Sequence, residues 1–309
     1  MHIPDGFIRD PLVWGGCGLL SAFVLGLAIR HTQEELSERA TLLPAMTGAF
    51  LFAAQMFNFP VAGGTSGHLL GGVLACMLLG GWSGILVTAF VLIVQCLLFQ
   101  DGGITALGAN ILNMAVVGGG LGFSLYSVGA RLTQAPKLRL MLLGVAAFLS
   151  VMLSATLAAL EIGLSGVVPL ATALSAMWLV HLPIALAEGV ITASVVSALH
   201  RLRPELLQGF DQKAIPPQVW LTGGAVIATI ALLALGFASS HPDGLERVAE
   251  TLGFSSRAFA ALPAPFPDYQ TSEGDSYLLR ALVSGVGLTA VGGALYALNR
   301  WIQTSGRRF

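Results

Sequence analysis

The chain has 309 residues, of which 10% are charged and 55% are Ala, Val, Ile, Leu, Met, Phe, Trp, Tyr or Cys. Soluble proteins carry about 25% charged residues, so this composition, with a mean hydropathy of +0.80, excludes a soluble globular domain. The net charge of −1 excludes a broad basic surface for nucleic acid. The cysteines Cys17, Cys76 and Cys96 lie in apolar stretches and provide neither a disulfide framework nor a CxxC metal site.

Apolar stretches recur along the whole chain. A membrane-spanning helix needs about 20 predominantly apolar residues. Stretches that approach this length lie near residues 12–30, 41–57, 68–80, 82–100, 105–129, 138–160, 167–200, 218–240 and 278–299. The third of them is short and is bracketed by glycines. We therefore expect an all-α fold, a polytopic membrane helical bundle of about nine transmembrane helices in the lipid bilayer.

The positions of Lys and Arg predict the orientation of this bundle, because cytoplasmic loops collect positive charge. With nine crossings and the N-terminus outside, four arginines face out: Arg9, Arg247, Arg257 and Arg280. The remaining basic residues face the cytoplasm: Arg30, Arg39, Arg131, Lys137, Arg139, Arg201, Arg203, Lys213, Arg300, Arg307 and Arg308. The C-terminus is then cytoplasmic. The first residues lack the pattern of a cleaved signal peptide, so we expect Met1 to be retained on the outer face.

A polar segment over residues 201–217 divides the chain into two predicted parts. Residues 1–210 form a core of about seven helices, and residues 211–309 form a helical hairpin with a long outer loop over 241–277. Within that loop, Leu245, Val248, Ala249 and Leu252 have the i, i+3, i+4, i+7 spacing of one apolar helical face. The spacing predicts a helix over 243–252, ended by Gly253, that lies against the outer surface of the core.

The first two residues, Met1 and His2, offer three nitrogens to one metal ion: the terminal amine, the His2 backbone amide and the His2 imidazole. Chelation by consecutive donors favours a flat arrangement, and four nitrogens in a plane suit Ni(II) or Cu(II). The glycine-rich segment FNFPVAGGTSGHLLGG, residues 57–72, carries His68. On this interpretation His68 supplies the fourth nitrogen.

The start MHIPDGFI, together with NFPVAGGTSGHLLGG, GANILNMAVVGGGLG (108–122) and HLPIALAEGVIT (181–192), resembles the CbiM/NikM family. These are the substrate-binding membrane components of energy-coupling-factor transporters for cobalt and nickel. The outer loop over 241–270 resembles the small CbiN/NikN partner.

The resemblance implies that Met1, His2 and His68 hold the metal. The bound Ni2+ or Co2+ is then the transported substrate, and no cofactor is expected. It also implies a non-enzymatic component of a prokaryotic plasma membrane, which works with a transmembrane coupling subunit and ATP-binding cassette ATPase subunits on separate chains. The sequence has no P-loop, GxxxxGK[ST], so ATP hydrolysis is expected from those partners.

Two other functions remain open from the residues alone. Ser66 lies in a GxSG segment of the kind that intramembrane serine proteases use, and His181 could act as its base. A passive metal channel would need a continuous polar pore, which the spans do not reveal. The polar residues Glu188, Asn110, Asn113, Gln55 and Gln95 are expected to brace helices by hydrogen bonds.

Overall fold

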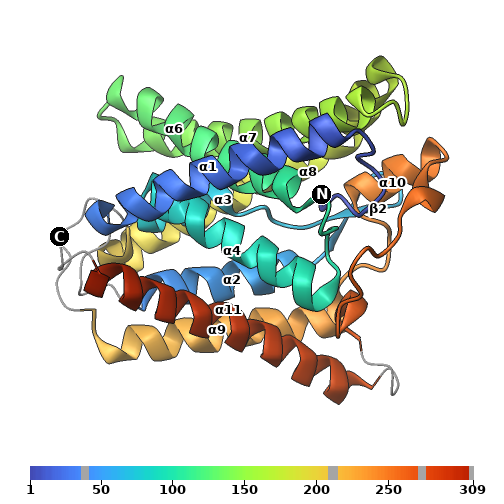
Figure 1. The fold of residues 1–309 in the computed structure, drawn as a ribbon. Coiled ribbons are helices and arrows are strands. Elements are labelled where there is room, and N and C mark those ends of the chain that lie inside the picture. The colour runs from blue at the N-terminus through green and yellow to red at the C-terminus, as the bar shows by residue number, and fades with distance from the viewer. Residues whose placement is uncertain (36–41, 208–214, 271–275, 306–309) are drawn as a thin grey trace.

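A computed structural model describes residues 1–35, 42–207, 215–270 and 276–305, which form a bundle of helices lying side by side (Figure 1). Seven helical segments within the described residues are long and apolar enough to cross a membrane. They are α1 (Pro11–Glu35), α4 (Gly81–Phe99), the segment Leu107–Arg131, α7 (Pro136–Leu164), α8 (Leu170–Leu202), α9 (Pro217–Phe237) and α11 (Tyr277–Ser305). The all-α membrane fold is thus confirmed.

The second and third expected spans are shorter than the sequence predicted, so two of the nine expected helices do not reach membrane length. The helix α2 (Leu43–Met56) has 14 residues and α3 (Gly72–Leu79) has 8. At about 1.5 Å per residue, neither spans a hydrocarbon core of about 30 Å. Between them lies an antiparallel pair of short strands, β1 (Phe59–Val61) and β2 (Thr65–Gly67).

Glycines explain why this region is not one long helix. Gly71 precedes α3 with a φ of 71°, and Gly80 follows it with a φ of 101°. This left-handed backbone region interrupts a helix and is readily adopted only by glycine. The chain from Thr65 to Gly71 is extended or irregular, and it is buried among the helices. Irregular backbone at membrane depth is tolerated where protein covers it.

The segment Leu107–Arg131 also departs from a regular α-helix. It comprises α5 (Leu107–Asn110), a π-helical stretch η2 (Ile111–Leu121) and α6 (Gly122–Arg131). The stretch packs tightly against the start of α3. The backbones of Gly72 and Gly119 are so close that a Cβ atom added at Gly72 would lie 2.7 Å from the Cα atom of Gly119. Such close backbone packing is possible only between very small residues.

The C-terminal helices α9 and α11 pack beside α2 in the same bundle (Figure 1). A Cβ atom at Gly287 would collide with the Phe52 ring, so α11 and α2 are in close contact. The predicted boundary at residues 210 and 211 lies outside the described residues, and the division into two parts stays a prediction. The outer loop contains α10 (Gly244–Thr251) and two short turns, η4 (Ser255–Arg257) and η5 (Pro267–Tyr269).

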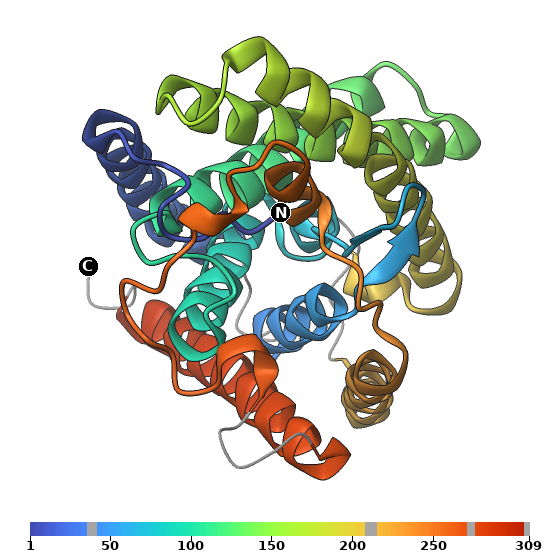
Figure 2. The ribbon, with the colours of Figure 1, turned by 90° about the vertical axis from the view of Figure 1, so that its right-hand side faces the viewer.

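The helix predicted in the outer loop is confirmed. Leu245, Val248 and Ala249 of α10 are buried in one apolar cluster with Met1. Gly253 follows with a φ of 74°. Seen from that end of the bundle, α10 lies next to the N-terminus (Figure 2). The loop helix therefore covers the region that the N-terminal residues occupy.

The two predicted groups of basic residues lie at opposite ends of the bundle. Arg131 ends α6 and Arg201 lies in the last turn of α8 at one end of the bundle, whereas Arg247 lies in α10 at the other end (Figure 1). Arg9 and Arg257 line one pocket. Which end faces the cytoplasm stays a prediction. Arg39, Lys213, Arg307 and Arg308, which the same prediction used, lie outside the described residues.

Candidate functional site

The N-terminal segment is buried between α4, α5 and the outer loop. Met1, Ile3, Phe7 and Ile8 are each at most 5% exposed. The Ile3 N–H donates to Asn110 Oδ1 (2.8 Å), and the Ile3 carbonyl accepts from Asn110 Nδ2 (3.0 Å). These paired bonds fix the backbone directly after His2.

Asp5 ties the same segment to two other parts of the chain. Its Oδ1 accepts from the Thr105 N–H (2.7 Å) and hydroxyl (2.6 Å), which lie just before α5. Its Oδ2 accepts from the Ala261 N–H of the outer loop (3.0 Å), and its carbonyl accepts from the Phe259 N–H (3.2 Å). The N-terminal segment is therefore held from both sides.

The terminal amine of Met1 faces His68. The ammonium donates to His68 Nε2 (3.0 Å) and to Asp243 Oδ2 (2.7 Å). His68 Nδ1 donates in turn to the Leu69 carbonyl (3.1 Å), so the lone pair of Nε2 points at the amine. Burial, the ammonium charge and His2 lower the pKa of His68 to about 3. The imidazole is therefore neutral, which is the form that binds metal ions.

His2 lies beside His68, with the two rings stacked at a centroid distance of 5.1 Å. His2 Nδ1 is 3.0 Å from Asp101 Oδ1, and the Tyr269 hydroxyl donates to Asp101 Oδ2 (2.7 Å). Burial alone would raise the pKa of Asp101, but its contacts with His2 and Tyr269 hold that pKa well below its usual range. The other His2 nitrogen, Nε2, is buried and has no hydrogen-bond partner within the described part of the chain.

The sequence matches the profile of the CbiM family, described as the cobalt uptake substrate-specific transmembrane region, over residues 2–206. The chain belongs to the CbiM family.

Two relatives of this CbiM-family chain match it over nearly its full length. A relative from Archaeoglobus fulgidus, named "Putative fused nickel transport protein NikMN", is 36% identical over 99% of this chain and 100% of the relative. Another fused NikMN from Rhodobacter capsulatus is 32% identical over 97% of this chain and 99% of the relative. The fold is similar to the crystal structure of a truncated transition metal transporter, with a TM-score of 0.58 and 30% sequence identity. The match covers 65% of this chain and 99% of that chain.

These matches establish the protein at a coarse level. It is a cobalt/nickel transport component and not an enzyme, and it is a multi-pass protein of a prokaryotic plasma membrane. They leave open which residues bind the metal.

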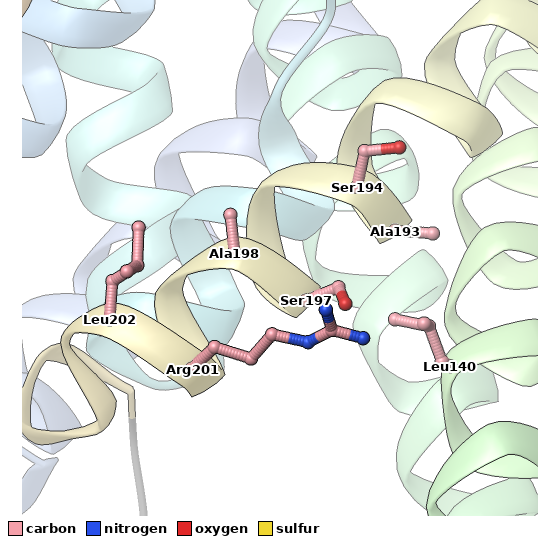
Figure 3. A pocket seen from close by; sticks show the side chains of 7 residues that line it. All are labelled: Leu140, Ala193, Ser194, Ser197, Ala198, Arg201 and Leu202. Carbon is pink, nitrogen blue, oxygen red and sulfur yellow. The ribbon is translucent and has the colours of Figure 1, made fainter.

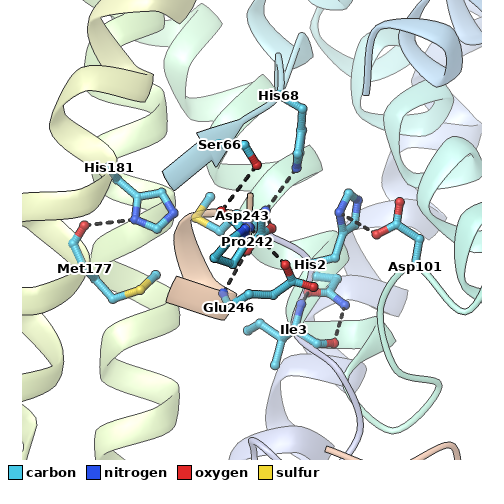
Figure 4. A network of polar contacts seen from close by, with 12 residues as sticks. His2, Ile3, Ser66, His68, Asp101, Met177, His181, Pro242, Asp243 and Glu246 are labelled. Carbon is cyan, nitrogen blue, oxygen red and sulfur yellow. Dashed lines mark hydrogen bonds and ion pairs between the residues drawn. The ribbon is translucent and has the colours of Figure 1, made fainter. Parts of the chain in front are cut away.

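The structure brings together the three residues that the sequence predicted. The Met1 nitrogen lies 3.0 Å from His68 Nε2, and the rings of His2 and His68 are stacked, as the close view of the two histidines shows (Figure 4). Among the described residues, no group of three or more His, Cys, Asp or Glu side chains has the arrangement of a metal site.

Sequence reasoning missed two carboxylates at this site, Asp101 and Asp243. Asp243 carried a signal, since Asp243 and Glu246 have the spacing of a helix capping box. The structure forms that box at the start of α10. Asp101 lies in a short connection between two helical segments, and no pattern around it indicated a contact with His2.

The predicted Ser66–His181 pair of a protease does not form in this CbiM-family protein. The Ser66 hydroxyl donates to the His241 carbonyl (2.7 Å), whereas His181 Nδ1 bonds the Met177 carbonyl (2.9 Å) (Figure 4). Within the described part of the chain, no hydrogen bond joins the two side chains. The protease hypothesis therefore has no support in the structure, and the relatives are transport proteins.

Glu188 braces the segment that carries His68, as expected. Its carboxylate accepts from the Leu70 N–H (2.7 Å) and the Gly71 N–H (2.9 Å). Gln55, which lies on α2, donates from its Nε2 to the Leu70 carbonyl (2.9 Å). These bonds satisfy backbone groups that no helix or strand would otherwise pair. Residues on α2 and α8 thus fix the position of His68.

A groove at the far end of the bundle lacks metal-binding chemistry. It has a volume of about 510 Å³ and is lined by side chains of α7 and α8, namely Leu140, Ala193, Ser194, Ser197, Ala198, Arg201 and Leu202 (Figure 3). Its one ionisable side chain is the cation Arg201, which repels metal ions. The candidate site is therefore the cluster around Met1, His2 and His68.

Proposed function

We propose that this chain is the substrate-capture component of an energy-coupling-factor importer for Ni2+ or Co2+. It binds the metal at its outer face through the Met1 amine, the His2 amide and imidazole, and His68. The observation that carries this proposal is the buried contact of 3.0 Å between the Met1 nitrogen and His68 Nε2. Two donors about 2.1 Å from one metal ion, at right angles, lie about 3.0 Å apart. The amine and the imidazole thus already have the spacing of adjacent ligands.

The remaining two donors come from His2. Its amide nitrogen closes a small ring with the Met1 amine, and a second ring with its own Nδ1. In the structure, Nδ1 bonds Asp101 (3.0 Å). Metal binding on this scheme therefore requires the imidazole to exchange Asp101 for the metal. The proton on Nδ1 that bonds Asp101 also leaves that nitrogen, and the amine and the amide each lose a proton. Four nitrogens with a deprotonated amide favour Ni(II).

The partners follow from what the chain lacks and from its relatives. The sequence has no P-loop for ATP. Two full-length relatives are named as fused nickel transport proteins. On this proposal a transmembrane coupling subunit and ATPase subunits, supplied as separate chains, drive release of the metal into the cell.

The test changes the terminal amine and leaves every side chain unchanged. An uncleaved tag before Met1 converts the amine into an amide, which is a poor donor at neutral pH, and also forces extra residues into a buried space. Purified protein with this tag should lose high-affinity Ni2+ binding. Protein with the same tag after Phe309 should retain it, because the last described turn of α11 lies at the end of the bundle opposite the N-terminus (Figure 1). Equal metal loading of the two proteins would refute the proposed site.

A further inference from the structure

Among the described residues, two groups accept hydrogen bonds from the Met1 amine, and one of them changes its role when metal binds. The amine donates to His68 Nε2 and to Asp243 Oδ2. On the proposed function, the Nε2 lone pair is given to the metal and no longer accepts a hydrogen bond from the amine. A coordinated primary amine keeps two N–H groups, and Asp243 can still accept one of them.

Asp243 is itself held in place by bonds to its own helix. Its Oδ1 accepts from the Glu246 N–H (2.8 Å), and its N–H donates to Glu246 Oε2 (2.9 Å). This capping box at the start of α10 leaves Oδ2 for the amine. The contact is well shielded from solvent, since the Met1 side chain is 2% exposed and that of Asp243 is 13% exposed.

The segment before Asp243 is bonded to the segment that carries His68. The Ser66 N–H donates to the Pro242 carbonyl (2.9 Å), and the Ser66 hydroxyl donates to the His241 carbonyl (2.7 Å). Asp243 and His68 are therefore fixed relative to each other through Ser66. The amine lies between them (Figure 4).

We propose that Asp243 is a positioning residue for metal capture, whose carboxylate holds the terminal amine beside His68 before and after the metal binds. This inference rests on the proposed function, because it takes the amine as a ligand. A chain terminus is ordinarily mobile, and the Asn110 bonds fix the backbone only from Ile3 onward. Without Asp243, rotation of Met1 would move the amine away from the metal.

The decisive variant is Asp243→Asn, which keeps the size of the side chain and its ability to cap a helix. Its oxygen is needed for the Glu246 N–H, so its NH2 group faces the Met1 amine, donor against donor. Asp243→Ser also caps the helix but cannot reach the amine. The matched control is Glu246→Gln, which retains the capping box and leaves Asp243 unchanged.

Two measurements on the full-length protein with a C-terminal tag are needed. The first is Ni2+ affinity, by competition with a chromogenic chelator. The second is the rate at which an amine-reactive reagent modifies Met1 in metal-free protein. The sequence has only two lysines, Lys137 and Lys213, so peptide mass spectrometry can follow Met1 separately, with the exposed Lys137 as an internal standard.

We expect Asp243→Asn and Asp243→Ser to weaken Ni2+ binding about 10- to 100-fold, the range for residues that orient metal ligands. Both should also label Met1 faster relative to Lys137, whereas Glu246→Gln should match the wild type in both measurements. Unchanged affinity and labelling in both Asp243 variants would overturn the inference and leave the proposed function intact. Faster labelling with unchanged affinity would also overturn the inference, because Asp243 would then hold the amine without helping the metal to bind.

Discussion

The side-chain hydrogen bonds named below for the two ends of the bundle join residues at very different distances along the sequence. At the end with the candidate site, Met1 bonds Asp243, 242 positions away, and Ser66 bonds His241, 175 positions away. At the other end, Arg139 bonds Thr133 and Gln134, which are 6 and 5 positions away. The comparison indicates that the site is assembled from distant segments, so a local change there alters several of them. A local change at the far end should stay local.

The largest effect should come from removing a metal donor. His68→Ala takes away the nitrogen next to the Met1 amine, and it should weaken Ni2+ binding more than about 100-fold, since even residues that only orient ligands cost 10- to 100-fold. Ser66→Ala is the matched control, because it loses one hydrogen bond, which costs about 0.5–1.5 kcal/mol. Equilibrium metal binding to the two purified variants compares them. A harmless His68 change with a fatal Ser66 change would contradict the coordination scheme.

A second large effect should follow from removing the outer-loop contacts as a group. Replacing residues 243–268 with a Gly/Ser linker deletes α10 and the bonds of Asp243, Phe259 and Ala261 to the N-terminal segment. Metal uptake by cells with the partner subunits should fall sharply, while the helices on both sides still insert. Uptake at the wild-type rate, with equal protein in the membrane, would reduce the loop to a tether.

An intermediate effect is expected at Asn110, which touches the N-terminal backbone but no proposed ligand atom. Asn110→Ala removes both hydrogen bonds to Ile3, so the buried N–H of Ile3 loses the Asn110 oxygen to which it donates. An unsatisfied buried group costs about 1–3 kcal/mol, and we expect roughly a tenfold loss of Ni2+ affinity, measured by chelator competition. An affinity within twofold of the wild type would show that the outer loop alone fixes the segment.

The sequence predicted those parts of this architecture that depend on neighbouring residues. The apolar face of Leu245, Val248 and Ala249 identified α10, because helical spacing is local. The sequence predicted about nine membrane-spanning helices, whereas seven described helices reach that length. Hydropathy records the length of an apolar stretch but does not register the φ angles of Gly71 and Gly80, which interrupt it. Hydropathy is equally high for a long helix and for a short helix that follows a buried extended segment.

The site was predictable only where a ligand pattern was visible in one segment. Met1 and His2 stand together, and His68 lies in an unusual glycine-rich segment. Asp101 and Asp243 are ordinary acidic residues in sequence, and their roles arise from contacts with residues 99 and 242 positions away. Such pairings follow from the packing of the whole bundle, which no local pattern specifies.

The smallest effect is expected at the far end, and it tests the comparison most directly. Arg201 lines the groove between α7 and α8, and none of its described neighbours there belongs to the candidate site. Surface substitutions away from special features change stability by about 0.5 kcal/mol or less. Arg201→Gln should therefore bind Ni2+ within about twofold of the wild type in purified protein.

A tenfold loss would mean that the two ends are energetically coupled through α8, the helix on which Glu188 supports the segment of His68. Because α8 is one continuous helix from Leu170 to Leu202, it joins the groove to Glu188, and Glu188→Gln in the same assay would then show a loss of similar size.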